Sequence, residues 1–408
     1  MTAVRLTTRE RGPRRPRSLR LPGLAAVLVI VVVAVVLWPS GGSAEDRRGA
    51  TQAIERLFEA VARGSDASSA DLCRSVGPRT RRGFAGLARY LPEPRRACSA
   101  LRPDLLRAAL GPLPGTEGRE LEADVDGDVA VVSVDDGPEV SRALRRTDRW
   151  LPDPGLGGLG RWRLETSRRC SDALTSARLT PLATDPERYG RAIEVRVRGV
   201  DAVLEMLADD GLPAGIGGVA AEPRRALQEL RDGLRRAERA IAGGDLGRDA
   251  PDASRLPSLL QLLEAFPSLR AVGVICLGGP AIPDASVEAG TDACLAARPE
   301  VDSAYKQAGR ASDDATAAAA FDRLAMTWAT LGERFSTLDV GDAEGLGTVR
   351  DVVAASAGTA AESARQIAAA AREGTEAPGA PGELNLAQQS ALEGLIALGL
   401  RRCGDIGV

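Results

Sequence analysis

The chain downstream of residue 48 begins with a helical pattern of apolar positions. After Ala50, apolar side chains recur at positions i, i+3, i+4 and i+7, which predicts an amphipathic helix that buries one face. These side chains are Ile54, Leu57, Phe58 and Val61. Shorter helical pieces are predicted around Ala70–Cys73 and over Ala97–Leu110, with a break between them at Pro92 and Pro94.

Apolar and polar residues then alternate with a period of two. Alternating runs at 121–125 and 129–134 flank the Asp-Gly pair at 126–127, which predicts a β-hairpin with a type I′ turn. Further strands are predicted at Glu139–Arg146 and at Arg161–Thr166. Helices followed by an antiparallel sheet predict an α+β domain.

Beyond Cys170 the pattern is helical again, and it occurs twice. The interval from Cys170 to Cys276 spans 106 positions and that from Cys294 to Cys403 spans 109. Each interval contains two long helical patterns, a loop rich in Pro and Gly, and a leucine-bearing helix before its last Cys. The long helices are predicted over Pro186–Ala208, Glu222–Ala242, Ala315–Thr337 and Thr348–Arg372. This self-similarity predicts a duplicated helical unit.

One uncharged apolar run, Leu21–Trp38, precedes all of these elements. Its 18 residues, at about 1.5 Å per residue, come close to the thickness of a bilayer core. Seven arginines and only one acid, Glu10, lie before it, so the positive-inside rule predicts a cytoplasmic N-terminus and an extracytoplasmic body at the plasma membrane. The alternative is a cleaved signal peptide, because Gly42-Ser43-Ala44 offers small residues for a peptidase.

The predicted fold class is therefore an α+β domain followed by mainly α-helical domains, with one N-terminal transmembrane helix. The predicted segments are a basic cytoplasmic tail (1–20), a transmembrane helix (21–38), a linker (39–48), the α+β domain (49–170), a first helical unit (171–276), a connector (277–293) and a second helical unit (294–408).

Four features of residues 49–170 carry a resemblance. They are ARGSDASSADLC at 62–73, a second helical cysteine at Cys98, VDGDVAVVSV at 125–134 and RWRLET at 161–166. With these features the segment resembles the α+β cone of the nuclear-transport-factor-two-like (cystatin-like) superfamily, in the divergent form common in exported actinobacterial proteins. The resemblance implies a curved sheet around a pocket, with Trp162 in the core or in the pocket lining.

The same resemblance bears on chemistry. Enzymatic members of that superfamily often use His and Asp in the pocket, and this chain contains no His. The ending LIALGLRRCG at 395–404 resembles an uncharacterised helical module of actinobacterial envelope proteins, which implies no activity.

Charge and cysteine content exclude further classes of function. The formal charge of −3 becomes −9 once the tail's +6 is removed, so the exported body is not expected to bind nucleic acid or anionic lipid. An even number of cysteines in an oxidising compartment predicts disulfides rather than metal sites. The duplication predicts the pairs Cys73–Cys98, Cys170–Cys276 and Cys294–Cys403, and the rival pair Cys276–Cys294 remains open.

Motifs that suggest chemistry have simpler interpretations here. The G-x-G-x-x-G at 155–160 is predicted to be a loop between strands, and Asp124, Asp126 and Asp128 a hairpin, because Val129 stands where a calcium loop needs Gly. Without His the usual Ser and Cys triads cannot form, and Lys306 is predicted to be solvated. We therefore predict no catalytic residue, no metal ligand and no cofactor.

Two functions fit these expectations. The first is a non-enzymatic, membrane-anchored envelope protein that contacts the membrane through residues 21–38 and binds other envelope proteins as a scaffold. The second is a small-molecule or lipid-binding protein that uses the pocket of the cone.

Overall fold

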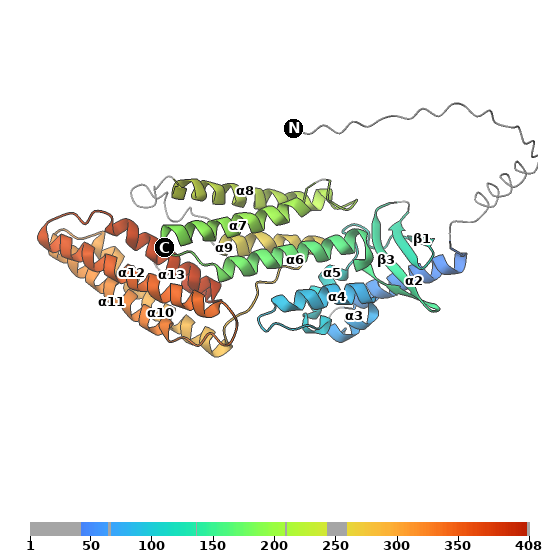
Figure 1. Ribbon diagram of the computed structural model, residues 1–408, viewed down its shortest axis with the longest axis horizontal. Coiled ribbons are helices and arrows are strands. Elements are labelled where there is room, and N and C mark those ends of the chain that lie inside the picture. The colour runs from blue at the N-terminus through green and yellow to red at the C-terminus, as the bar shows by residue number, and fades with distance from the viewer. Residues whose placement is uncertain (1–41, 64–66, 136, 209, 243–258, 406–408) are drawn as a thin grey trace, which may run out of the picture.

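The computed structural model describes residues 42–63, 67–135, 137–208, 210–242 and 259–405. These form an elongated molecule with a small sheet at one end and α10–α13 at the other (Figure 1). The predicted tail (1–20), the predicted transmembrane helix (21–38) and the loop at 243–257 lie outside the described residues. Among the residues that are described, no helix is both long and apolar enough to cross a membrane.

The N-terminal part combines short helices with one antiparallel sheet in the order β1-β2-β3-β4. Its elements are α2 (Ala44–Ala62), α3 (Ser69–Ser75), α4 (Pro78–Leu87), η2 (Ala88–Tyr90), η3 (Cys98–Ala100), α5 (Pro103–Leu110), β1 (Leu121–Asp126), β2 (Val129–Val134), β3 (Glu139–Arg146), β4 (Arg149–Pro152) and η4 (Pro154–Leu156). Helix α2 crosses the inner face of the sheet and buries Ala50 and Ile54 against Val125 and Val132. This confirms the predicted α+β order.

One predicted strand is wrong. Arg161–Thr166 belongs to α6 (Gly158–Leu179), and the tryptophan-bearing strand is β4, which carries Trp150. The six residues alternate as a strand would, but the buried positions over a longer window have helical spacing. Because α6 packs against α7 as well as against β3 and α4, burial favoured a helix over a strand here. These buried positions are Leu159, Trp162, Arg163, Thr166, Ser167 and Cys170.

Three smaller differences have local causes. Helix α2 begins six residues before Ala50, because the Ser43 side chain caps it by accepting a hydrogen bond from the Asp46 N–H. Pro103 starts α5 and separates it from η3, which splits the helix predicted at 97–110. The predicted type I′ turn is wrong: in the β1–β2 turn only Gly127 has a positive φ, whereas type I′ needs two such residues.

The rest of the chain forms two groups of helices in parallel order. The first comprises α6, α7 (Pro186–Met206), α8 (Gly217–Ala242), α9 (Leu259–Ala265) and η6 (Phe266–Val272). The second comprises α10 (Asp284–Ala308), α11 (Asp314–Ser336), α12 (Leu346–Glu373), α13 (Ala380–Ala397) and η7 (Arg401–Asp405). The first three helices have 22, 21 and 26 residues in one group and 25, 23 and 28 in the other.

The disulfides follow the same parallel. Cys170 of α6 is bonded to Cys276 after η6, and Cys294 of α10 is bonded to Cys403 of η7, with 5.3 Å between the Cα atoms in both. A third disulfide joins Cys73 to Cys98. All three predicted pairs are confirmed, and the rival pair Cys276–Cys294 does not form. A duplicated helical unit would produce this arrangement of disulfides, and the duplication itself stays a prediction.

Helices also cross the domain boundaries that were predicted from the sequence. Helix α6 runs through residue 170, and α10 covers the second half of the connector predicted at 277–293. One continuous hydrophobic core extends from the inner face of the sheet through both helical groups, while a second core lies under α3–α5. The sheet and the helical groups are therefore packed together as one body.

A buried ion pair joins the two helical groups. Arg196 of α7 donates to Glu393 of α13 at 3.2 Å, and both side chains are at most 3% exposed. The Glu393 carboxylate also accepts the Leu259 N–H at the start of α9, at 2.8 Å. Burial raises the pKa of Glu393, and the charge of Arg196 opposes that shift. Removal of Arg196 would therefore leave a buried carboxylate without its counter-ion.

We expect Arg196→Met to destabilise the protein by about 3–5 kcal/mol near neutral pH, the typical cost of breaking a buried pair. The pKa of Glu393 is already raised above its ordinary 4.5 and rises further without the guanidinium. Because folded Glu393 then holds its proton more tightly than unfolded Glu393, the stability of R196M should be greatest below pH 4.5 and should fall as pH rises through the folded pKa. Thermal melts of R196M, referenced to wild type at each pH, measure this.

The double variant R196M/E393Q is the control, since its neutral amide still accepts the Leu259 N–H. Its stability relative to wild type should depend less on pH than that of R196M. A pH-independent loss in R196M would contradict the assignment of the effect to Glu393.

Candidate functional site

Residues 274–279 cross the middle of the molecule without regular secondary structure, and side chains of α6 supply several of their hydrogen-bond partners. Ser167 Oγ accepts the Ile275 N–H at 2.8 Å, and Ser171 Oγ accepts the Leu277 N–H at 2.9 Å. Both serines are fully buried. Since an unpaired buried N–H costs about 1–3 kcal/mol, these hydroxyls fix the position of the segment.

Arg163 of α6 anchors the N-terminal part in the same way. Its guanidinium is 4% exposed and donates to backbone carbonyls alone, at 2.9 Å to Val272 and 2.6 Å to Gly111. Ala109 and Pro112 provide two further carbonyl acceptors. Burial lowers the pKa of Arg163 to about 10, which leaves it a cation at neutral pH.

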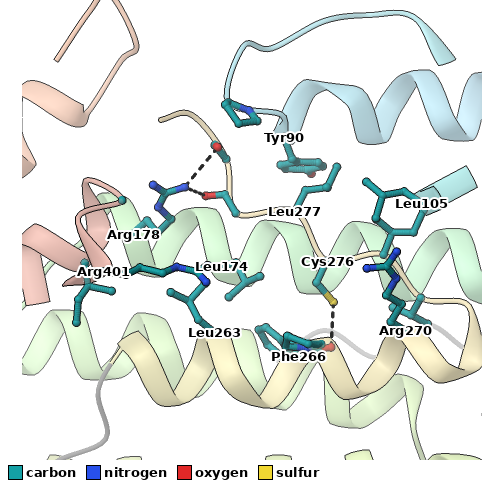
Figure 2. Close-up of a pocket in the computed structure, with 18 residues that line it drawn as sticks. Tyr90, Leu105, Leu174, Arg178, Leu263, Phe266, Arg270, Cys276, Leu277 and Arg401 are labelled. Atoms are coloured by element: carbon teal, nitrogen blue, oxygen red, sulfur yellow. Dashed lines mark hydrogen bonds between the residues drawn. The ribbon is translucent and has the colours of Figure 1, made fainter. Parts of the chain in front are cut away.

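A pocket of about 310 Å³ opens where this segment meets all three parts of the molecule (Figure 2). Tyr90 and Leu105 come from the N-terminal part, α6 and η6 contribute Leu174 and Phe266, and the end of α13 adds Ile396. The disulfide at Cys276 forms part of the wall. We name this cavity the junction pocket.

Three guanidinium groups line the junction pocket, and none of its lining residues is acidic. Arg178 donates to the Gly278 carbonyl at 2.8 Å and to the Ala397 carbonyl at 2.8 Å, so it ties the segment to α13. Burial, together with the nearby charge of Arg401, lowers the pKa of Arg178 to about 10. Arg401 is exposed and has no ion pair with any described residue.

The other two polar groups of the junction pocket are already engaged. Arg270 donates to Asp104 at 2.7 Å. The Tyr90 hydroxyl donates to Asp172, and the guanidinium of Arg89 lies 4.5 Å from the centre of the Tyr90 ring. Burial, and then the bond to Asp172, raises the pKa of Tyr90. The bonds of Arg178 use its Nε and Nη1 atoms, and its Nη2 donates to no described residue. The groups left for a ligand are the apolar floor, Arg178 Nη2 and Arg401, which suit an anion with an apolar tail.

The structure places Trp162 away from the junction pocket. Its side chain is 5% exposed in the main core, and its indole N–H donates to the Met206 carbonyl at 2.7 Å. The inner face of the sheet around it is closed by α2 and α6, with Ala130 and Val132 fully buried. Trp162 therefore acts in packing, and the cavity lies outside the sheet.

The glycine motif at 155–160 follows β4 and opens α6, so the prediction of a loop between strands is wrong. The space above its glycines is nevertheless filled by protein. A Cβ on Gly158 would collide with the Glu139 carboxylate, and one on Gly157 would lie 2.6 Å from the Arg142 guanidinium. Glu139 and Arg142 are themselves paired at 3.0 Å. Ion pairing thus occupies the place that a dinucleotide phosphate would need.

The remaining motifs have the predicted structural roles. Asp124, Asp126 and Asp128 are exposed on the β1–β2 hairpin, and Lys306 is exposed on α10. Among the described residues no group of three or more His, Cys, Asp or Glu is arranged to hold a metal ion.

Sequence reasoning missed Tyr90, Arg178 and Arg401. They lie more than 80 positions apart, and no spacing rule joins them. The sequence contained one relevant signal, the hydroxyl and arginine side chains that lie on the buried face of α6. Their common face could be recognised only once the segment was known to be helical.

Comparison of the chain with protein-family models, with curated proteins and with solved structures finds no match. The resemblance of residues 49–170 to the nuclear-transport-factor-two-like superfamily therefore stays a prediction.

We expect Ser171→Ala to destabilise the protein by about 1–3 kcal/mol, because the Leu277 N–H loses its acceptor inside the protein. Ser176→Ala, at an exposed position of the same helix, is the matched control and should change stability by less than about 0.5 kcal/mol. Chemical denaturation of both variants measures the difference. Equal midpoints would show that the segment is held by other contacts.

Proposed function

We propose that this chain is a membrane-tethered binding protein of the cell envelope that holds a small anionic amphiphile in the junction pocket without enzymatic chemistry. One observation carries the proposal: an apolar floor lies beside Arg178 and Arg401, with no carboxylate in the lining. Apolar walls with a few well-placed polar groups are typical of small-molecule sites. The volume of about 310 Å³ lies at the small end of the range of about 300–1,000 Å³ that is usual for ligand sites, so a small amphiphile suits it better than a long lipid.

Two further features support the envelope location. Three disulfides are expected in an oxidising compartment outside the cytoplasm. Helix α2 begins at Ala44, only a few residues after the predicted transmembrane helix at 21–38, so the sheet end would lie nearest the membrane and α10–α13 farthest from it (Figure 1).

A second function, as a scaffold for other envelope proteins, is favoured by exposed apolar side chains on the distal helices. Leu295 of α10 is 45% exposed and Met326 of α11 is 62% exposed, beside a shallow groove between these helices. Loss of binding to other envelope proteins on Met326→Glu, with decanoate binding intact, would favour this second function.

Binding of sodium decanoate to the full chain tests the first function. Arg401→Glu should weaken binding at least tenfold, because one charge-assisted contact contributes about 1.5–3 kcal/mol. Arg402→Glu is the matched control, since Arg402 is exposed beside Arg401 but does not line the pocket. Isothermal titration calorimetry measures both.

Decanol, which has the same chain without the charge, should bind more weakly than decanoate and respond little to Arg401→Glu. Leu263→Trp should block both ligands by filling the floor. Equal decanoate affinity in the Arg401 and Arg402 variants, or no binding to wild type, would refute the proposal.

A further inference from the structure

A second cationic hollow lies between α4 and α6 and shares no lining residue with the junction pocket. Its volume is about 340 Å³. Five arginines and a single acid, Glu165, line it, although the exported body as a whole is acidic. The five are Arg79, Arg82, Arg89, Arg161 and Arg168. We name this site the arginine hollow.

The arginines form two stripes at helical spacing. Arg79, Arg82 and Arg89 follow one another at i, i+3 and i+10 along α4 and η2, and Arg161 and Arg168 at i and i+7 along α6. Such positions share one face of a helix, so the stripes face each other across the hollow. The charges are thus gathered by the crossing of two helices.

Only part of this charge is neutralised. Arg168 pairs with Glu165 at 2.6 Å and lies 3.5 Å from Asp172, to which Arg89 is also close at 3.7 Å. The side chains of the other three arginines, Arg79, Arg82 and Arg161, form no ion pair with any residue that the structure describes. Three guanidinium groups without a counter-ion around one hollow raise the local positive potential, which favours an anion between them.

A buried carboxylate holds the two stripes in place. Asp153, just before α6, is fully buried and accepts hydrogen bonds from the Thr80 N–H at 2.8 Å and the Arg79 N–H at 3.2 Å, at the start of α4. The Thr80 hydroxyl in turn accepts the Gly155 N–H at 2.9 Å. This cap ties the first turn of α4 to the start of α6, so the spacing of the arginines is built into the fold.

Two glycines of α4, Gly83 and Gly86, line the floor of the hollow and add no side chains to it. A Cβ on Gly83 would lie 2.7 Å from Leu164 Cδ1, so glycine there lets α4 approach α6 closely. A Cβ on Gly86 would meet nothing within 4 Å. The hollow is therefore open above Gly86 and bounded at its sides by guanidiniums.

We propose that the arginine hollow binds a phosphoryl group, carried either by a free phosphate compound or by a phospholipid headgroup. Guanidinium groups bind phosphate oxygens through paired N–H donors, and several of them around one opening favour a multiply charged anion over chloride. The local charge of the hollow, rather than the net charge of the chain, determines this preference. Because the arginines are exposed, binding weakens as salt concentration rises.

Pyrophosphate binding to the full chain in dodecylmaltoside micelles tests this proposal. Arg82→Gln combined with Arg161→Gln should weaken binding at least tenfold, and wild-type binding should weaken between 50 and 300 mM NaCl. The charge-matched control is R236Q/R239Q, which removes two exposed arginines of α8 and should leave the affinity unchanged.

A second pair of variants tests the hollow itself. Gly86→Glu places a carboxylate in open space on a helix and should abolish binding, whereas Gly86→Gln has nearly the same size and should retain most of it. Both side chains form helices better than Gly, so both variants should fold. Unfolding curves verify this.

The same titration in micelles doped with phosphatidylglycerol distinguishes the two sources of phosphoryl groups. If phosphatidylglycerol leaves the pyrophosphate affinity unchanged, the hollow binds a free phosphate compound. If phosphatidylglycerol weakens the pyrophosphate affinity and phosphatidylcholine does not, the hollow binds an anionic lipid headgroup. Equal binding by wild type and R82Q/R161Q, equal loss in R236Q/R239Q, or no pyrophosphate binding by wild type overturns the proposal.

Discussion

The satisfaction of backbone hydrogen bonds by side chains of α6 is the constraint on which the rest of the structure depends. Arg163 donates to the carbonyls of Ala109, Gly111, Pro112 and Val272, and Ser167 and Ser171 accept the N–H groups of Ile275 and Leu277. Each of these buried backbone groups would cost about 1–3 kcal/mol if it were left without a partner. The N-terminal part and the helical groups are thus joined through one helix, with the disulfide Cys170–Cys276 at its centre.

The junction pocket is a consequence of this arrangement. Residues 274–279 follow α6 instead of forming a helix, so η6, the end of α13 and Tyr90 meet around them without closing (Figure 2). Arg178 then joins the segment to α13 through carbonyl acceptors and keeps its charge at neutral pH. The same contacts that hold the three parts together leave cationic groups beside an apolar floor.

The two cationic sites show how little net charge says about local charge. Residues 21–408 carry a formal charge of −9, yet the lining of the junction pocket contains no acid and that of the arginine hollow contains one. Much of the acidic charge lies in exposed pairs, which contribute little to stability in water. The buried pair Arg196–Glu393 has a different role, since it joins α7, α9 and α13 at the contact between the helical groups.

The sequence by itself determined the elements whose signals are local. The helical periods predicted α7, α11 and α12 to within two residues, and alternation predicted β1, β2 and β3. The two nearly equal cysteine intervals predicted the disulfides Cys170–Cys276 and Cys294–Cys403, which left Cys73 and Cys98 as the third pair. These features are readable because burial of one face imposes a period on neighbouring residues. The strand prediction at 161–166 rested on only six residues. Over so short a segment, alternation of apolar and polar residues does not distinguish a strand from one face of a helix.

Only the tertiary structure decided the sites. Tyr90, Arg178 and Arg401 meet because three separate parts of the chain pack around α6, and the arginine hollow exists because a buried aspartate sets how α4 approaches α6. The tertiary structure also closed the inner face of the sheet, where the resemblance implied a pocket. A local pattern states which face of an element is buried, but the partner of that face depends on long-range packing, which leaves no spacing signal in the chain.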